Sequence, residues 1–156
     1  MIYSIGPEET SIRVVMLKLL MAVEKGGLHK LEIPMLHRSM GRVGKAIEHW
    51  EKRSVEEAKD IPISVRSASS AFDCKNDGLY IVLDEFLKDL ALFGVVTLES
   101  GENGEYMRFA SDARQLLKET LGRLCEIHKD EEPYFDALAK VGVDFYRKLT
   151  TNSCCD

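Results

Sequence analysis

Cysteine is scarce in the chain, and none of its four cysteines belongs to a CxxC pair. Cys154 and Cys155 are adjacent, a spacing at which geometry rarely favours a mutual disulfide. The sequence also has no long uninterrupted apolar run, because "VVMLKLLMAV" contains Lys18 and follows two glutamates rather than a basic segment. Without a disulfide framework, signal peptide or membrane span, the chain is expected to be a soluble cytoplasmic protein that does not bind membranes.

Motifs for catalysis and cofactor binding are also missing. The four histidines are scattered and form no HxH or HExxH pair, so they lack the spacing of zinc or iron ligands. No GxSxG, Walker or GxGxxG motif occurs, and "GENGE" is too short and too acidic to bind phosphate. We therefore expect no enzymatic activity, no catalytic residue, no metal site and no cofactor.

Positive charge is in deficit, and the deficit is uneven along the chain. The 26 acidic residues outnumber the 21 lysines and arginines, which gives a formal net charge of −5, so any nucleic-acid site must be local. Residues 77–106 contain seven acids and one base, whereas residues 28–53 contain six bases and three acids. One part of the protein is therefore expected to be acidic and another part basic.

Apolar periodicity predicts one compact domain. The chain has 156 residues, of which 45% are hydrophobic, so it is long enough to bury a single core. Gly94 is expected to end a helix in the left-handed conformation, and "GENG" to form the turn of a hairpin. Helices are predicted at about residues 11–24, 34–52, 64–72, 79–93, 111–128 and 134–149, and the hairpin at about residues 95–109.

These elements define the predicted fold class, which is mainly α with one short β-hairpin (α+β). A single domain is expected over residues 1–150, and a flexible tail over residues 150–156. Within the domain, residues of about 35–110 form one unit of helices and hairpin, and the helices at 11–25 and 111–149 are additions at either end of the sequence. These additional helices are expected either to pack on the centre or to dimerise.

A basic stripe lies along the predicted helix 34–52. Its apolar side chains Leu36, Met40 and Val43 recur at spacings of four and three residues and so face the core. Basic residues follow two positions later and therefore lie on the opposite side of the helix. The stripe consists of Arg38, Arg42, Lys45, His49 and Lys52. It is either a solvated helix face, partly neutralised by neighbouring glutamates, or a surface that contacts anions or nucleic-acid phosphates.

The order of short helix, turn, longer helix and two-stranded wing over residues 61–110 resembles the winged helix-turn-helix superfamily. This resemblance implies a small DNA-binding transcription regulator that contacts double-stranded DNA. The phosphate contacts would then come from seven basic residues: Arg38, Arg42, Lys45, Lys52, Arg66, Lys88 and Arg108.

The chain departs from the superfamily in the charge of its longer helix and wing. Their exposed positions are mostly acidic, and carboxylates repel phosphates. The alternative is therefore a protein–protein interaction or adaptor module, which keeps the winged-helix fold and binds a partner protein through its acidic face without binding DNA.

The first and last predicted helices have wide apolar stripes. The helix at 11–24 is either central in the core or shared with a second subunit, and the helix at 134–149 either closes the core or forms a dimer interface. Together they carry more apolar surface than one small core readily covers, which favours a homodimer. The residues expected at this interface are Val14, Leu17, Met21, Phe135, Leu138, Phe145 and Leu149.

Overall fold

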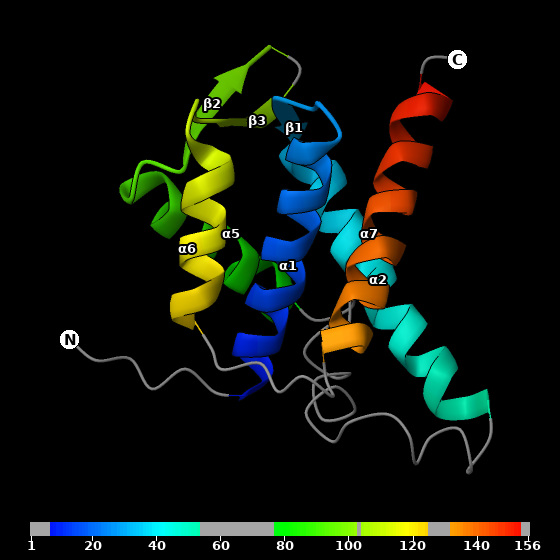
Figure 1. The fold of residues 1–156 in the computed structure, drawn as a ribbon. Coiled ribbons are helices and arrows are strands. Elements are labelled where there is room, and N and C mark those ends of the chain that lie inside the picture. Colours follow the sequence, from blue (N-terminus) through cyan, green and yellow to red (C-terminus); the bar gives the residue numbers. More distant parts are fainter. Residues whose placement is uncertain (1–6, 54–76, 103, 125–131, 154–156) are drawn as a thin grey trace.

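The computed structural model describes residues 7–53, 77–102, 104–124 and 132–153 (Figure 1). Its helices are α1 (Pro7–Lys25), α2 (Ile33–Arg53), α5 (Asp77–Leu92), α6 (Ala113–Leu124) and α7 (Glu132–Ser153). Its strands are β1 (Lys30–Glu32), β2 (Val96–Gly101) and β3 (Gly104–Phe109). A mainly helical structure with a small antiparallel sheet confirms the predicted fold class. The predicted helix at 64–72, which includes Arg66, lies outside the described residues, as do all the cysteines.

Helix α1 lies in the centre of the fold. It contacts α6 and α7 on its two sides, and α5 packs behind it (Figure 1). Val14, Val15 and Met16, which are successive and therefore point in different directions around the helix, are each at most 1% exposed. A helix that is apolar on nearly all sides needs neighbours on all sides. Of the two positions considered for this helix, the structure has the central one.

This central position corrects part of the predicted dimer interface. Four of the seven residues expected there are at most 4% exposed within the single chain: Val14, Leu17, Phe135 and Leu138. They are buried because α7 covers α1, so the two apolar stripes cover each other. Met21, Phe145 and Leu149 are half-buried. The homodimer itself stays a prediction, but these four side chains cannot form its surface.

Helix α7 crosses both α1 and α2 at close range. A Cβ atom added at Gly142 would lie 2.7 Å from Leu19 Cδ1 and 3.4 Å from Val43 Cγ2, which shows how closely the three helices approach. The helix also continues to Ser153, so the tail predicted to begin at residue 150 was placed too early. The Thr151 hydroxyl donates a hydrogen bond of 2.8 Å to the Arg147 carbonyl one turn earlier, within this last part of the helix.

The predicted hairpin is present, and the sheet contains a third strand that the sequence did not indicate. The strand order is β1-β3-β2, and all neighbours are antiparallel. Strand β1 has only three residues, and its central Leu31 pairs with Met107 of β3. Both side chains are fully buried. Strand β1 thereby connects α1 to α2 and fixes the hairpin to the helical part of the fold.

A hydrogen bond joins this first strand to the last helix. The Glu32 backbone N–H donates to the Tyr146 hydroxyl at 3.0 Å, and the Tyr146 side chain is almost completely buried. Burial raises the pKa of the Tyr146 phenol above its ordinary value. The protonated, neutral form of the Tyr146 phenol is therefore favoured more strongly in the folded protein than in the unfolded chain.

Replacing Tyr146 with phenylalanine should lower the free energy of unfolding by about 1 kcal/mol at neutral pH, because the Glu32 N–H loses its partner. The pH dependence should change as well. Since the folded pKa is raised, the wild type keeps its full stability below the unfolded pKa of about 10 and loses stability as the pH rises above it. Tyr146→Phe should lack this alkaline loss. Urea unfolding between neutral and alkaline pH, with Tyr80→Phe as control, measures both effects; identical curves for Tyr146→Phe and wild type would contradict them.

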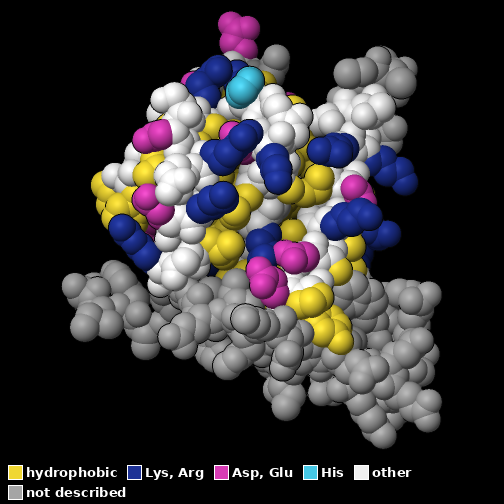
Figure 2. Space-filling view, viewed as in Figure 1, with side chains coloured by type: hydrophobic (Ala, Val, Ile, Leu, Met, Phe, Trp, Pro, Cys, Tyr) yellow, Lys and Arg dark blue, Asp and Glu magenta, His cyan; other side chains and the backbone are white. Residues whose placement is uncertain are grey.

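Charge is distributed unevenly over the surface. Figure 2 shows the face formed by α6, α1 and α7, where Lys and Arg side chains surround an apolar strip. The basic side chains that border this strip include Lys18, Lys25, Lys140 and Arg147. Most acidic side chains of residues 77–106 belong to α5 and the hairpin.

Candidate interaction face on α5 and the hairpin

Helix α5 has an apolar inner side and a mixed outer side. Its inner side chains are at most 3% exposed: Leu79, Leu83, Phe86, Leu87 and Leu90. Its outer side chains follow one another at spacings of four, three and four residues: Ile81, Glu85, Lys88 and Leu92. Such spacings place the outer side chains on one line along the helix. The outer line thus combines apolar ends with charged residues between them.

Large apolar side chains are exposed on this helix and on the strand that follows. Ile81 is 55% exposed, Leu92 82%, Phe93 73% and Leu98 41%. Among the side chains that the structure describes, these are the only large hydrophobic ones that are exposed. Exposed apolar residues that gather in one region mark a contact surface more often than scattered ones do.

The end of α5 explains why Phe93 is exposed. Gly94 has a φ of +78°, and its N–H donates to the Ala91 carbonyl at 3.1 Å, while the Val95 N–H donates to the Leu90 carbonyl at 2.9 Å. This pattern is the left-handed cap predicted for Gly94, and it turns the chain sharply into β2. The turn buries Val95 and leaves Phe93 in solvent.

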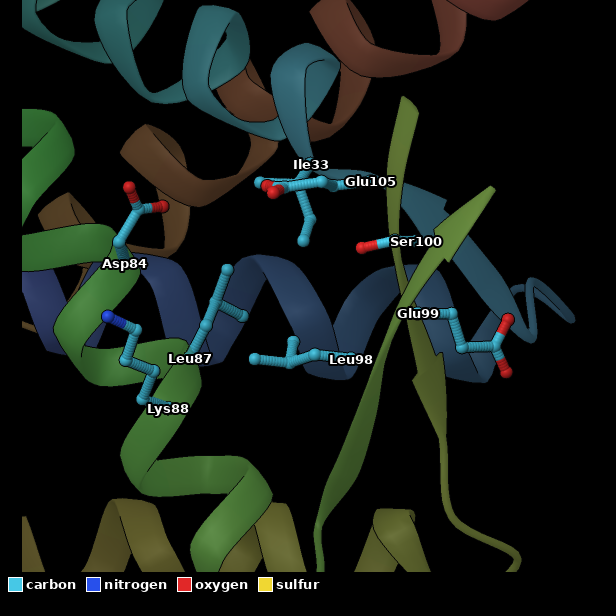
Figure 3. A pocket seen from close by; sticks show the side chains of 8 residues that line it. All are labelled: Ile33, Asp84, Leu87, Lys88, Leu98, Glu99, Ser100 and Glu105. Carbon is cyan, nitrogen blue, oxygen red and sulfur yellow. The ribbon is translucent and has the colours of Figure 1, made fainter. Parts of the chain in front are cut away.

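A hollow of about 260 Å³ lies between α5, the start of α2 and the hairpin (Figure 3). Its apolar side chains are Ile33, Leu87 and Leu98, and the last two point toward each other across it. Its polar lining residues are Asp84, Lys88, Glu99, Ser100 and Glu105, and the carboxylate of Glu99 points away from the hollow. The hollow therefore has an apolar floor and a rim with more carboxylates than amines.

Two cations of the sheet are already paired. Arg108 Nε donates to Glu99 Oε1 at 2.9 Å, and Lys30 Nζ lies 3.9 Å from Glu99 Oε2. The hydrogen bond from Arg108 lowers the pKa of the Glu99 carboxyl group. Arg108, one of the predicted phosphate contacts, is therefore engaged by a carboxylate of the same hairpin.

A second polar contact joins α5 to α2 at the edge of the hollow. His37 Nε2 on α2 lies 2.7 Å from Asp84 Oδ1 on α5, and the His37 ring lies 5.0 Å from the Tyr80 ring. Sequence periodicity gave no indication of this pair, because its two residues are 47 positions apart. The contact holds α5 against α2 at the edge of the hollow.

Several carboxylates of this region have no ion pair with any described residue: Glu85, Asp89, Glu102 and Glu105. The nearby Lys88 is also exposed and has no such pair. The region therefore keeps the acidic excess expected from its sequence. We call the exposed part of this surface the α5–hairpin face, and define it as Ile81, Glu85, Asp89, Leu92, Phe93 and Leu98.

The structure brings together three of the seven predicted phosphate contacts, and we call Arg38, Arg42 and Lys45 the basic cluster. They border a separate hollow of about 360 Å³, together with Gly41, Tyr80 and Phe145. The Arg42 guanidinium carbon lies 5.9 Å from the centre of the Phe145 ring. Lys88 lies instead at the acidic hollow, and the side chains of His49 and Lys52 lie outside the described residues.

Within the described ranges, no group of three or more His, Cys, Asp and Glu side chains could hold a metal ion. Over the same ranges, no helix is both long enough and apolar enough to cross a membrane. The chain was also compared with protein-family models, with curated proteins and with solved structures, and none of the three comparisons found a match.

Proposed function

We propose that the chain is a winged-helix-type interaction module, which binds a partner protein through the α5–hairpin face. The observation that carries the proposal is the exposure of Ile81, Leu92, Phe93 and Leu98 near carboxylates that form no ion pair with any described residue. Apolar side chains in contact with water favour association, and the surrounding acids select a basic partner surface. The partner chemistry that fits is an apolar surface bordered by Lys or Arg.

The order of the elements supports the winged-helix part of the proposal. Helix α5 leads through Gly94 directly into the antiparallel hairpin of β2 and β3, and it packs against β2. The contacts of α5 with α1 and α2 add a helical base beneath the hairpin. In this arrangement the outer side of α5 is the side that a winged-helix protein would present to its ligand.

DNA fits that side of the helix poorly. A duplex brings closely spaced phosphates, and the outer side of α5 would meet them with Glu85 and Asp89 against a single Lys88. Contact with a phosphate backbone would not stabilise exposed apolar side chains such as Leu92 and Phe93. A protein surface, by contrast, can bury them and pair the acids at the same time.

DNA binding by a small transcription regulator is the second candidate, and one observation favours it. Arg38, Arg42 and Lys45 border one hollow and form no ion pair with any described residue. Three cations in one place, none of them paired within the described part of the chain, suit the phosphates of a duplex. In that case α2 rather than α5 would carry the contact.

Two labelled probes separate these candidates in one anisotropy assay. The first is a helical peptide of leucine and lysine with its leucines on one face, and the second is a mixed-sequence DNA duplex. We expect the peptide to bind and the duplex not to bind. Glu85→Lys with Asp89→Lys should weaken peptide binding by about tenfold or more, because each reversed charge now repels the peptide lysines.

The controls test the position of the site and its apolar part. Asp112→Lys with Glu119→Lys changes the net charge equally but lies on another part of the surface, so it should leave peptide binding unchanged. A scrambled peptide of the same composition should bind less tightly, because its leucines no longer share one face. If the duplex binds instead, with an affinity that falls steeply with salt and is lost in Arg42→Glu with Lys45→Glu, DNA binding is the function and the proposal is wrong.

A further inference from the structure

A groove runs between α1, α6 and α7 on the face shown in Figure 2. Its volume is about 480 Å³, and most of the surface that lines it is apolar. Its apolar side chains are Met21, Ala22, Leu121, Ala139 and Val143. The charged side chains at its border are Lys18, Lys25, Asp136, Lys140, Asp144 and Arg147. We call this feature the basic groove.

The charges of the basic groove are only partly balanced. Lys18 is occupied, because its Nζ lies 2.6 Å from Asp136 Oδ1. Lys25, Lys140 and Arg147 form no ion pair with any described residue. Of the groove's two lining acids, this leaves only Asp144 beside three cations that have no ion pair among the described residues. The groove therefore has an apolar floor and a positive border, which is the partner chemistry that the α5–hairpin face requires.

The two surfaces also agree in length. The groove follows α7 from Asp136 to Arg147, which are eleven residues apart, or about 16 Å along a helix axis. The outer line of α5 runs from Ile81 to Leu92, which are also eleven residues apart and therefore also span about 16 Å. The line has an apolar residue at each end, Glu85 and Lys88 lie between them, and Asp89 is exposed beside Lys88.

We infer that the partner bound by the α5–hairpin face is a second copy of this chain, whose basic groove receives it. The inference rests on the proposed function, because it names the partner of the same face. In the contact, Leu92 and Phe93 would cover the apolar floor, and Glu85 and Asp89 would approach Lys140 and Arg147. Opposite charges and exposed apolar groups on both sides make the contact complementary.

The geometry makes this association head-to-tail. Helix α5 lies behind the layer that α6, α1 and α7 form in Figure 1, so the face and the groove are different surfaces of one molecule. Each copy can then bind one neighbour through its α5–hairpin face and a second neighbour through its basic groove. Such heterologous contacts form short chains or rings rather than a closed symmetric pair.

The test uses two charge-reversed variants, alone and mixed. The groove variant is Lys140→Glu with Arg147→Glu, and the face variant is Glu85→Lys with Asp89→Lys. Sedimentation velocity is measured from about 10 to about 300 µM protein, in about 20 mM and about 500 mM salt, because screening should weaken the contact. We expect the wild type to grow in size with concentration at low salt, and each variant alone to remain at the chain mass of 17.6 kDa.

The mixture is the decisive measurement. An equimolar mixture contains one intact face and one intact groove, and its reversed face and reversed groove again carry opposite charges. The mixture should therefore associate at low salt, although each variant alone stays at 17.6 kDa. The control Lys118→Glu with Lys148→Glu, which reverses two exposed cations outside the groove lining, should associate like the wild type. Circular dichroism of every variant shows that the fold is retained.

Three results would overturn the inference: a wild type that stays at 17.6 kDa at the highest concentration in low salt, a variant that associates as the wild type does, or a mixture that fails to pair. The leucine–lysine peptide then tells which proposal has failed. If the peptide still binds the face of a monomeric wild type, only the second copy as partner is wrong. If the peptide does not bind either, the proposed function is wrong as well.

Discussion

Replacing Leu17 with alanine is expected to lower the free energy of unfolding by about 2–5 kcal/mol. The Leu17 side chain is 0% exposed within the single chain. The substitution would remove three carbon atoms and leave a cavity in the core beside the central helix. The side chains around this cavity can relax only partly, because they are held by neighbours on several sides. The loss should be the same at low and high protein concentration, because it arises inside one chain. Chemical denaturation at two concentrations, about a hundredfold apart, measures it.

The matched control for this experiment is Leu92→Ala. This substitution also replaces a helical leucine with alanine, but the Leu92 side chain is 82% exposed. We expect its effect to stay within about 0.5 kcal/mol. If Leu17→Ala left the stability of the monomer unchanged and acted only on association, Leu17 would belong to a dimer interface and its central position in the fold would be wrong.

Replacing Gly142 with leucine is expected to destabilise the fold by about 1–3 kcal/mol or more. The first atom of the new side chain would already lie 2.7 Å from Leu19 Cδ1, so α7 must move away from α1 and α2 to admit the rest. Gly122→Leu on α6 is the matched control, because a Cβ atom there meets nothing within 4 Å. That change should instead be neutral or stabilise the helix by up to about 1 kcal/mol, since glycine is a poor helix former.

Thermal unfolding of the two glycine variants beside the wild type gives the comparison. We expect Gly142→Leu to lower the stability of the fold and Gly122→Leu to leave it unchanged or raise it. A Gly142→Leu protein as stable as the Gly122→Leu protein would contradict the close crossing of the three helices.

The elements that the sequence predicted are those with local signals. The left-handed cap at Gly94 and the hairpin turn depend on residues that are neighbours in the chain, and both were predicted correctly. Strand β1 has three residues and exists because Leu31 pairs with Met107, which follows 76 positions later. No local pattern can indicate a strand whose partner is so distant.

Periodicity also could not distinguish a core from an interface. The spacing of Phe135 and Leu138 requires that something cover them, and it is satisfied equally by another helix of the same chain or by a second subunit. The structure shows that the chain itself covers them. In the candidate site, the acidic excess followed from composition, but the exposure of Leu92 and Phe93 depends on how α5 packs and ends. The pairing of Arg108 with Glu99 likewise depends on the register of the hairpin.

The position of α7 has a consequence for how the protein is made. Gly142 of α7 packs against Val43 of α2, although the two residues are 99 positions apart in the chain. At a synthesis rate of about 5–20 residues per second, the ribosome needs about 5–20 seconds to travel from one to the other. During that interval the apolar sides of α1 and α2 have no α7 to cover them. Nascent chains are therefore expected to be most prone to chaperone binding and aggregation just before their last helix is synthesised.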